Sequence, residues 1–230
     1  MTADTPLFWV VIPAAGVGSR MQADRPKQYL PLDGRCLIEH TLDCFLGQPG
    51  LLGLVVCLSA EDGWWPGLPC AADPRIARAD GGRERADSVL NGLHELASLG
   101  AAEDDWVLVH DAARPNLAET DLHKLLHALQ DDAVGGLLAV PVRDTLKLAD
   151  GHGRVSSTPD RTLFWQAYTP QMFRLGALRQ ALTDALASGA TITDEASAME
   201  WAGHAPRLIE GRADNIKVTR PEDLEVLRRR

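Results

Sequence analysis

Apolar runs of strand length alternate along the chain with segments whose apolar positions recur every three to four residues. The apolar runs occupy residues 7–12, 51–59, 75–79, 105–111 and 135–142. Several of them are apolar at every position, which suits strands that are buried on both faces of a sheet. Helix-like patterns occupy residues 36–46, 84–99, 118–130 and 174–189. Strands that alternate with helices predict an α/β sandwich with a mostly parallel sheet.

Two shorter helices and one irregular segment are expected in the second half of the chain. The first helix is TDEASAMEWAG, opened by Thr193 or Asp194, and the second is PEDLEVLRRR, with Pro221 in its first turn. Residues 144–161, DTLKLADGHGRVSSTPDR, instead alternate weakly around ADGHG and predict two strands with a tight turn that leave the main body. Because a lone hairpin is only marginally stable in water, we expect it to pack against a second copy of the chain.

Composition and charge narrow the class of protein. The chain has 230 residues, 45% hydrophobic and 24% charged, which fits one domain over residues 1–230 with a hairpin excursion at about 144–161. A net charge of -9 argues against a general grip on nucleic acid, which needs a basic face. No run approaches the roughly 18 apolar residues of a membrane span, and no signal-peptide pattern opens the chain. We therefore expect a soluble cytoplasmic protein that binds neither nucleic acid nor membrane.

The four cysteines contain no CxxC pair and are too widely spaced for a paired-cysteine zinc motif, so we interpret them as reduced packing residues. Arginine is the usual cation of this chain, with nineteen arginines against four lysines. The position of each lysine is therefore informative.

The loop after the first predicted strand, PAAGVGSRMQADRPKQYLPL (13–32), is a candidate phosphate site. Gly16 and Gly18 let backbone N–H groups turn toward an anion, and Arg20 and Lys27 add positive charge. The loop lacks the third glycine of GxGxxG, and the chain contains no GxxxxGK[ST], so neither the dinucleotide fingerprint nor the Walker loop fits. A glycine-rich turn with solvated cations explains the loop alone equally well.

Three further segments place chemistry at the same edge of the predicted sheet, because ligands of open α/β sheets bind where the strands end. Asp111 ends a strand and could hold Mg²⁺, directly or through water, contact a ribose hydroxyl, or simply pair with Arg114. GGRERADS (81–88) offers the backbone of two glycines and the hydroxyl of Ser88, or else an ordinary helix cap. Lys217 in NIKV is either a compact point charge for a ligand or a solvated strand lysine. We interpret His110 as a packed core residue and assign it no role.

Taken together and in order, these segments resemble the 2-C-methyl-D-erythritol 4-phosphate cytidylyltransferase family of the non-mevalonate isoprenoid pathway. The resemblance covers nearly the whole chain. It is carried by PAAGVGSRM with RPKQYLPL, DGGRERADSV, VLVHDAARP, PVRDTLK, YTPQMF, GATITDEASAMEW and EGRADNIKVTRPEDL. It implies a Rossmann-like nucleotidyltransferase fold, a homodimer clasped by projecting β-arms, and use of CTP with Mg²⁺ or another divalent cation.

The resemblance also implies roles for individual residues. Arg20 and Lys27 correspond to stabilisers of the transition state, and Arg161 and Lys217 to residues that position the substrate phosphate. The family's CTP contacts fall on Ala14, Ala15, Gly16, Gly82, Ser88, Asp111 and Ala112. The rest of the methylerythritol phosphate pocket falls on Arg114, Thr145, Thr169 and Thr193, with Thr145 and Arg161 supplied by the partner's arm. Arg83 stands where some relatives have an acidic residue, which would alter any side-chain contact to cytosine or ribose.

Two other functions are compatible with the same fold. A cytidylyltransferase for another polyol phosphate, such as ribitol 5-phosphate, would have a similar CTP half of the site. A non-catalytic nucleotide-binding subunit would keep the fold and lose the chemistry. The joint presence of Arg20, Lys27, Asp111 and Lys217 argues against that subunit, and the acceptor pocket distinguishes between the two enzymes.

Overall fold

A seven-stranded sheet forms the centre of the protein in a computed structural model, which describes residues 6–16 and 25–228. The strand order is β11-β7-β10-β6-β1-β4-β5. Every pairing is parallel except those of β10, which runs antiparallel to both of its neighbours. The strands are β1 (Phe8–Pro13), β4 (Leu51–Leu58), β5 (Ile76–Asp80), β6 (Trp106–Val109), β7 (Gly135–Pro141), β10 (Trp165–Arg174) and β11 (Arg207–Glu210). The predicted mostly parallel α/β sheet is confirmed.

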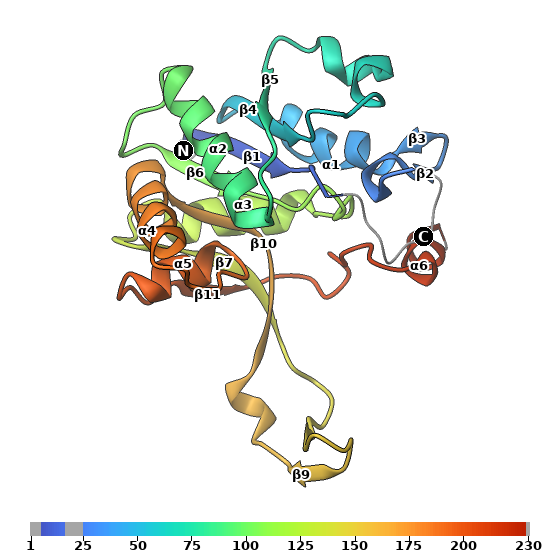
Figure 1. Cartoon of the computed structure of the whole chain (residues 1–230), viewed down its shortest axis with the longest axis vertical. Coiled ribbons are helices and arrows are strands. Elements are labelled where there is room, and N and C mark those ends of the chain that lie inside the picture. Colours follow the sequence, from blue (N-terminus) through green and yellow to red (C-terminus); the bar gives the residue numbers. More distant parts are fainter. Residues whose placement is uncertain (1–5, 17–24, 229–230) are drawn as a thin grey trace.

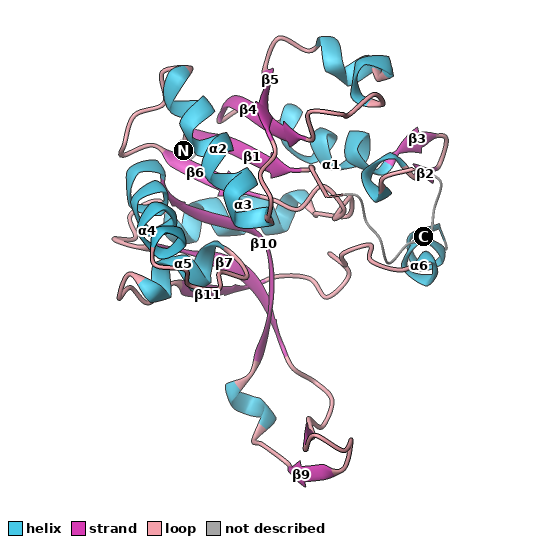
Figure 2. Ribbon diagram, viewed as in Figure 1, coloured by secondary structure: helices cyan, strands magenta, loops and turns pink. Residues whose placement is uncertain are grey.

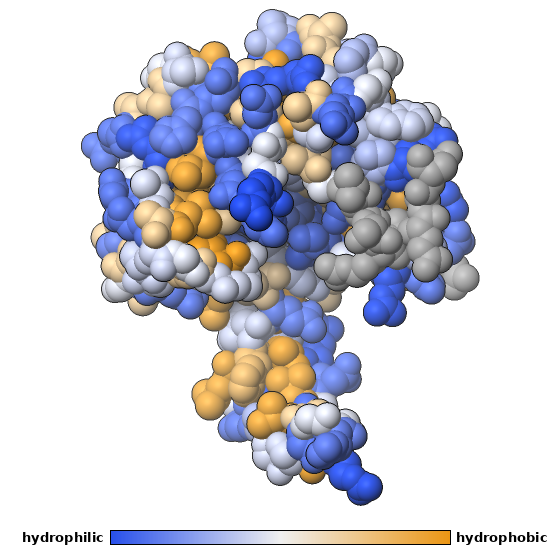
Figure 3. All heavy atoms as spheres, viewed as in Figure 1, coloured by the Kyte–Doolittle hydropathy of each residue, from blue (hydrophilic) through white to orange (hydrophobic). Residues whose placement is uncertain are grey.

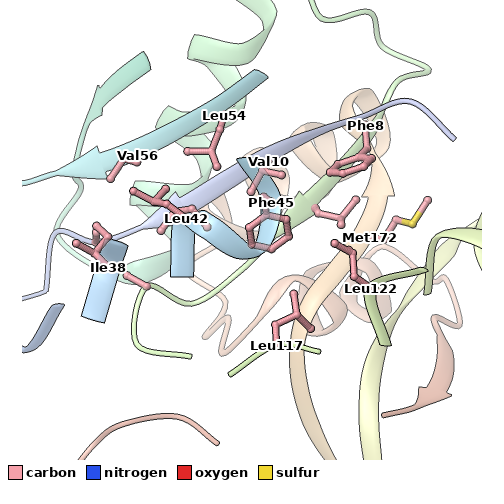
Figure 4. Close-up of a cluster of buried hydrophobic side chains, with 14 of the residues drawn as sticks. Phe8, Val10, Ile38, Leu42, Phe45, Leu54, Val56, Leu117, Leu122 and Met172 are labelled. Atoms are coloured by element: carbon pink, nitrogen blue, oxygen red, sulfur yellow. The ribbon is translucent and has the colours of Figure 1, made fainter. Parts of the chain in front are cut away.

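Helices cover both faces of the sheet (Figure 2). Those on the two faces are α1 (Leu37–Leu46), α2 (Arg85–Ser98), α3 (Glu119–Leu129), α4 (Leu175–Ala187) and α5 (Glu195–Trp201), whereas α6 (Pro221–Arg228) packs in a small separate core. Side chains of α1 and α3 pack against one face of the central strands, as Figure 4 shows for Ile38, Leu42 and Phe45 beside Val10. Side chains of α2, α4 and α5 pack against the other face, around Val11. The central strands β1, β4 and β6 are apolar at every position because both of their faces are buried.

Two strands of the sheet were not predicted from the sequence. β10 contains Pro170 and is exposed over its first three residues, whereas its second half is buried, so no single hydrophobic period extends along it. β11 is only four residues long and carries one buried side chain, Ile209. The pattern of hydrophobic residues reports which side chains are buried and not which backbone groups are hydrogen-bonded. It therefore does not indicate short edge strands, or strands that pass from solvent into the core.

The chain between β7 and β10 extends away from the main body, at the bottom of Figure 1. Within it, β8 (Leu148–Ala149) and β9 (Val155–Ser157) pair antiparallel around a turn, and η5 (Arg161–Leu163) is a single 3₁₀ turn. We call residues 143–164 the projecting segment. Apolar side chains gather on its surface and on the adjoining end of β10 (Figure 3). The most exposed of them are Leu148, Val155, Leu163, Phe164 and Trp165.

The closing part of the chain returns to the carboxyl ends of the strands. Val218 N–H donates to the carbonyl of Ala113, 2.8 Å away, and Val218 and Leu224 pack with Leu30 in a small separate core. The neighbouring Lys217 is thereby fixed beside the loop that follows β6. Within the described ranges, no helix is long and apolar enough to cross a membrane.

Candidate functional site

Two adjoining pockets open at the carboxyl ends of the central strands, where α/β sheets bind their ligands. The first has a volume of about 250 Å³ and the second about 190 Å³. Arg85, Asp111 and Lys217 line both of them. The described lining of the first is completed by Pro13, Ala14, Ala15, Gly16, Lys27, Gln28, Gly82, Arg83, Glu84, Ser88, Ala112 and Ala113. The second is completed by Arg114, Ala167, Tyr168, Thr169, Gln171, Thr193 and Asp194.

The loop after β1 forms one wall of the first pocket. Ala14 N–H donates to the carbonyl of Cys57, and the side-chain amide of Gln28 donates to the carbonyl of Ala14 at 2.6 Å. Ala14 is thus fixed to the end of β4, and Gln28 is fixed to Ala14. Lys27, in η2 (Lys27–Tyr29), is half-buried and lines the pocket as predicted. Two residues predicted for this loop, Gly18 and Arg20, lie outside the described residues.

The loop between β5 and α2 forms the facing wall, and its two glycines allow a close approach. A Cβ on Gly81 would lie 2.1 Å from the Cβ of Ala15, and one on Gly82 would lie 2.1 Å from the Cβ of Asp87. Gly82 N–H donates to the hydroxyl of Ser88 at 2.9 Å. Ser88, in the first turn of α2, therefore fixes this loop through its hydroxyl. The glycines are needed for packing as well as for any contact with a ligand.

Asp111 lies between the two pockets and is surrounded by cations. Its Oδ1 accepts from Arg85 Nε at 3.1 Å, and its Oδ2 accepts from Arg114 Nε at 3.1 Å and lies 3.0 Å from Lys217 Nζ. The residue is 6% exposed. Burial alone would raise the pKa of its carboxyl, but Arg85, Lys217 and Arg114 together hold that pKa well below its usual range. The carboxylate is therefore ionised and fixed, and it holds three positive groups in one place.

The second pocket combines cations with hydroxyl groups. Arg114 is buried, donates to the carbonyl of Asn215 at 2.7 Å, and lies with its guanidinium carbon 4.6 Å from the centre of the Tyr168 ring. The hydroxyl of Thr169 accepts from Asp111 N–H at 3.1 Å. Thr193 is exposed on the pocket rim beside Asp194, which caps α5. The structure thus brings the predicted residues Arg114, Thr169, Thr193 and Lys217 to one pocket.

His110 is completely buried, in agreement with its interpretation as a core residue. Its Nε2 lies 3.0 Å from the carbonyl of Arg114, and its Nδ1 lies 3.0 Å from the hydroxyl of Thr169. Burial lowers the pKa of His110 to about 4, so the ring is neutral near pH 7. The carbonyl can only accept, which places the proton on Nε2 and leaves Nδ1 as the acceptor. Both ring nitrogens are used internally, and the ring supports the loop that carries Asp111 and Arg114.

Two predicted residues lie elsewhere in the chain. Thr145 and Arg161 belong to the projecting segment and are not among the described lining residues of either pocket. Arg161 donates to the carbonyl of Arg143 within the same segment. They were predicted to serve a partner's site, which a single chain does not test.

The sequence reasoning missed Arg85 and Glu195. Arg85 is the first residue of α2 and Glu195 the first residue of α5. The two form a bidentate ion pair, with Nη1–Oε1 and Nη2–Oε2 distances of 2.6 and 3.1 Å. Both residues stood in segments that the sequence singled out, but only the fold brings positions 110 residues apart into contact.

The site provides limited protein ligands for a divalent cation. Among the described residues, no three or more histidine, cysteine, aspartate or glutamate side chains are grouped so that they could hold a metal ion. The carboxylate of Asp111 has about four acceptor positions, and its three cationic partners occupy three of them. The remaining position fits an ion that is held mainly by phosphate oxygens and water, as Mg²⁺ usually is.

Comparison with known proteins agrees with this geometry. The family model of 2-C-methyl-D-erythritol 4-phosphate cytidylyltransferase (IspD) matches residues 8–228. The chain belongs to this family. It is 70% identical to the protein of that name from Pseudomonas putida (strain W619), over 100% of this chain and 98% of the relative. It is 71% identical to the one from Ectopseudomonas mendocina (strain ymp), over 96% and 94%.

Solved structures of the family have the same fold. A crystal structure of a 4-diphosphocytidyl-2C-methyl-D-erythritol synthase is 40% identical, with a TM-score of 0.83 over 97% of each chain. The Francisella tularensis enzyme of the family is 34% identical, with a TM-score of 0.84 over 96% of this chain and 98% of that one. The predicted Rossmann-like nucleotidyltransferase sandwich is thereby confirmed as the fold.

Proposed function

We propose that this member of the family transfers the cytidylyl group of CTP to 2-C-methyl-D-erythritol 4-phosphate and releases pyrophosphate. The observation that carries the proposal is the shared wall of the two pockets, where Arg85, Asp111 and Lys217 face both. A nucleotide in the first pocket and a phosphorylated polyol in the second would meet at this wall. The product would be 4-diphosphocytidyl-2-C-methyl-D-erythritol, an intermediate for isoprenoid precursors.

We assign the nucleotide to the first pocket because its described lining combines a group of alanines and glycines with several charged side chains. Ala14, Ala15 and Gly16 on one side and Gly82 on the other leave room for a flat base and for phosphates close to the main chain. Ala112, which follows Asp111, also lines this pocket. Lys27 brings a full positive charge to the same space. We assign the predicted CTP contacts on this basis, and Arg20 remains a prediction.

The reaction needs no general base from the protein. A phosphate monoester has a second pKa of about 6, so the acceptor phosphate is largely a dianion at neutral pH. One of its oxygens attacks the α-phosphorus of CTP, forming a new P–O bond while the bond from the α-phosphorus to the bridging oxygen of pyrophosphate breaks. The bonding electrons leave with pyrophosphate. Both ring nitrogens of His110 are hydrogen-bonded within the protein, so this histidine is not available as a general base. The site is suited to a reaction that needs none.

The protein must bring two anions together and stabilise the charge that grows on the leaving group. Lys217 and Arg114 would hold the acceptor phosphate beside Asp111, and Lys27 would face the triphosphate. Fixed positive groups of this kind act by positioning and by electrostatic stabilisation. Asp111 keeps Lys217 and Arg114 close together when no substrate is present.

We propose that Mg²⁺, or another divalent cation, binds together with CTP. When bound, it would neutralise phosphate charge, and Asp111 would hold it directly or through water. Removal of divalent cations with EDTA is expected to abolish turnover, and added Mg²⁺ should restore it. Full turnover in EDTA would contradict this part of the proposal.

We also propose a homodimer formed through the projecting segment. Leu163 is 78% exposed, and Leu148, Val155 and Phe164 of the same segment are exposed as well. A small hairpin gains little stability by itself, so these apolar side chains favour packing against a partner. A second copy packed on these side chains would bury them and would bring Thr145 and Arg161 to the partner's acceptor pocket. Leu163→Asp should shift the protein from dimer to monomer in analytical ultracentrifugation. If the wild-type protein already has the mass of a monomer in this experiment, the proposal is contradicted.

The experiment that tests the proposed function is pyrophosphate release from CTP with two acceptors assayed side by side. With Mg²⁺ present, 2-C-methyl-D-erythritol 4-phosphate should support turnover and ribitol 5-phosphate should not. The reverse preference would identify the ribitol enzyme, and release with neither would identify a non-catalytic subunit. The cytoplasmic location expected from the sequence stays a prediction.

A further inference from the structure

Glu195 is buried behind the wall that the two pockets share, and it pairs with Arg85, which is part of that wall. Glu195 is 1% exposed, and both of its carboxylate oxygens accept from the guanidinium of Arg85. The third nitrogen of the same guanidinium, Nε, donates to Asp111 Oδ1 at 3.1 Å. One planar group thus joins two buried carboxylates that belong to different parts of the fold.

The position of Lys217 depends on this arrangement. Its ammonium lies 3.0 Å from Asp111 Oδ2, while Arg85 holds Oδ1 of the same carboxylate. If Arg85 were free to swing, the carboxylate could rotate about its side-chain bond. Lys217 and Arg114, both paired with Oδ2, would then shift with it. A change behind the wall would therefore move charge at the point where the two phosphates meet.

The chemistry of the contacts requires arginine at this place. A guanidinium presents its N–H groups in a fixed fork that pairs with one carboxylate bidentately and still donates from Nε. A lysine ammonium is a point charge on a flexible stem and cannot hold both carboxylates in the same geometry. The start of α5 adds to the fit, because Glu195 lies in its first turn, where a negative charge is favoured.

We propose that Glu195 and Arg85 form a positioning unit: Glu195 fixes Arg85, and Arg85 holds Asp111 so that Lys217 stays at the wall between the pockets. This inference rests on the proposed function. Glu195 is not among the described lining residues of either pocket and acts through Arg85, which in turn acts through Asp111 and Lys217. It therefore contributes to the rate of transfer more than to the binding of CTP.

The test uses Arg85→Lys, Glu195→Gln and the double variant in the pyrophosphate-release assay. Misplacing reacting groups by about 1 Å costs on the order of 100-fold in rate, so kcat of Arg85→Lys should fall by about that factor. Glu195→Gln should lose less, because the amide keeps one acceptor oxygen for Arg85. The KM for CTP should change by less than about 3-fold, since uniform binding is preserved.

The double variant distinguishes a unit from two separate residues. If Glu195 acts through Arg85, the double variant should lose little more than Arg85→Lys alone, because residues that act together are non-additive. A matched control is the exposed pair Arg179–Glu103, whose Nη2–Oε1 distance is 2.5 Å. Arg179→Lys and Glu103→Gln should both keep the wild-type kcat.

Several results would overturn the inference. They are an unchanged kcat in both single variants, additive losses in the double variant, or an effect confined to the KM for CTP. Glu195→Gln, which keeps the side-chain volume, carries the test if Arg85→Lys fails to fold, as thermal unfolding would reveal. Wild-type protein without turnover on either acceptor would overturn the proposed function as well, whereas normal wild-type turnover with unaffected variants would overturn this inference alone.

Discussion

Replacing Asp111 with asparagine is expected to destabilise the protein strongly, even though the two side chains have nearly the same volume. The carboxylate lies 3.0 to 3.1 Å from three positive groups, those of Arg85, Arg114 and Lys217. At an effective dielectric constant of 20, each such contact amounts to about 5 kcal/mol before the cost of desolvation is subtracted. Asparagine removes the charge and leaves the three cations facing one another.

The net effect is smaller than the sum of the contacts, because burying the carboxylate is itself costly. Removing one partner of a buried ion pair typically costs about 3–5 kcal/mol, and the remaining amide oxygen favours the lower end. For a chain of this size, about 3 kcal/mol corresponds to a decrease of about 6–12 °C in the melting temperature. Urea denaturation and differential scanning calorimetry measure both quantities.

Asp73→Asn is the matched control, because Asp73 pairs with Arg75 at an exposed position and the variant should melt close to the wild type. Sulfate should stabilise Asp111→Asn more than the wild type, since an added anion replaces the missing negative charge. If Asp111→Asn is no less stable than Asp73→Asn, or if sulfate has the same effect on both Asp111→Asn and the wild type, the electrostatic role of Asp111 is wrong.

Three further predictions concern catalysis and pH. Lys27→Ala should lower kcat by about 10² to 10³ with an unchanged melting temperature, as expected for loss of one preorganised charge, and wild-type kinetics would refute its role. Arg161→Ala should raise the KM for methylerythritol phosphate more than that for CTP, whereas equal increases would count against the partner's arm. The pKa of His110, about 4, lies below the value of about 6.5 in an unfolded chain. The unfolded state therefore binds the extra proton, and the free energy of unfolding should fall as the pH drops from 6.5 toward 4. Urea denaturation at pH 7 and pH 5 measures that slope, which His110→Gln should flatten.

The main elements of the fold were predictable because burial leaves a clear periodic signal. β1 and β4 are apolar throughout, and α1 to α4 bury one face each, so each predicted boundary lies within two residues of the observed one. β10 and β11 were not predicted. In β10 the environment changes from exposed to buried within one strand, and Ile209 is the single buried residue of β11. The hydrophobic pattern does not predict such strands, because they are defined by their backbone hydrogen bonds and not by the burial of alternate side chains.

The site was predictable where its residues follow strands and unpredictable where it depends on long-range contacts. Asp111, Arg114 and Lys27 follow predicted elements, and the rule for carboxyl ends of strands brings them to one edge. The bidentate pair of Arg85 and Glu195 has no such signal, since each residue alone is an ordinary first residue of a helix. The hydrogen bond from Gly82 in the loop to Ser88 in α2 has no sequence signal either, and it gives Ser88 a structural role beside the predicted ligand contact.

The most direct test of the account is to follow the products of one reaction by ³¹P NMR. CTP, 2-C-methyl-D-erythritol 4-phosphate and Mg²⁺ are mixed with the purified protein. We expect equal amounts of pyrophosphate and a new diphosphate diester, with ¹⁸O from a labelled acceptor phosphate found in the bridge between its two phosphorus atoms. Release of inorganic phosphate without a diester, or a bridge that carries no ¹⁸O from the acceptor, would contradict this expectation.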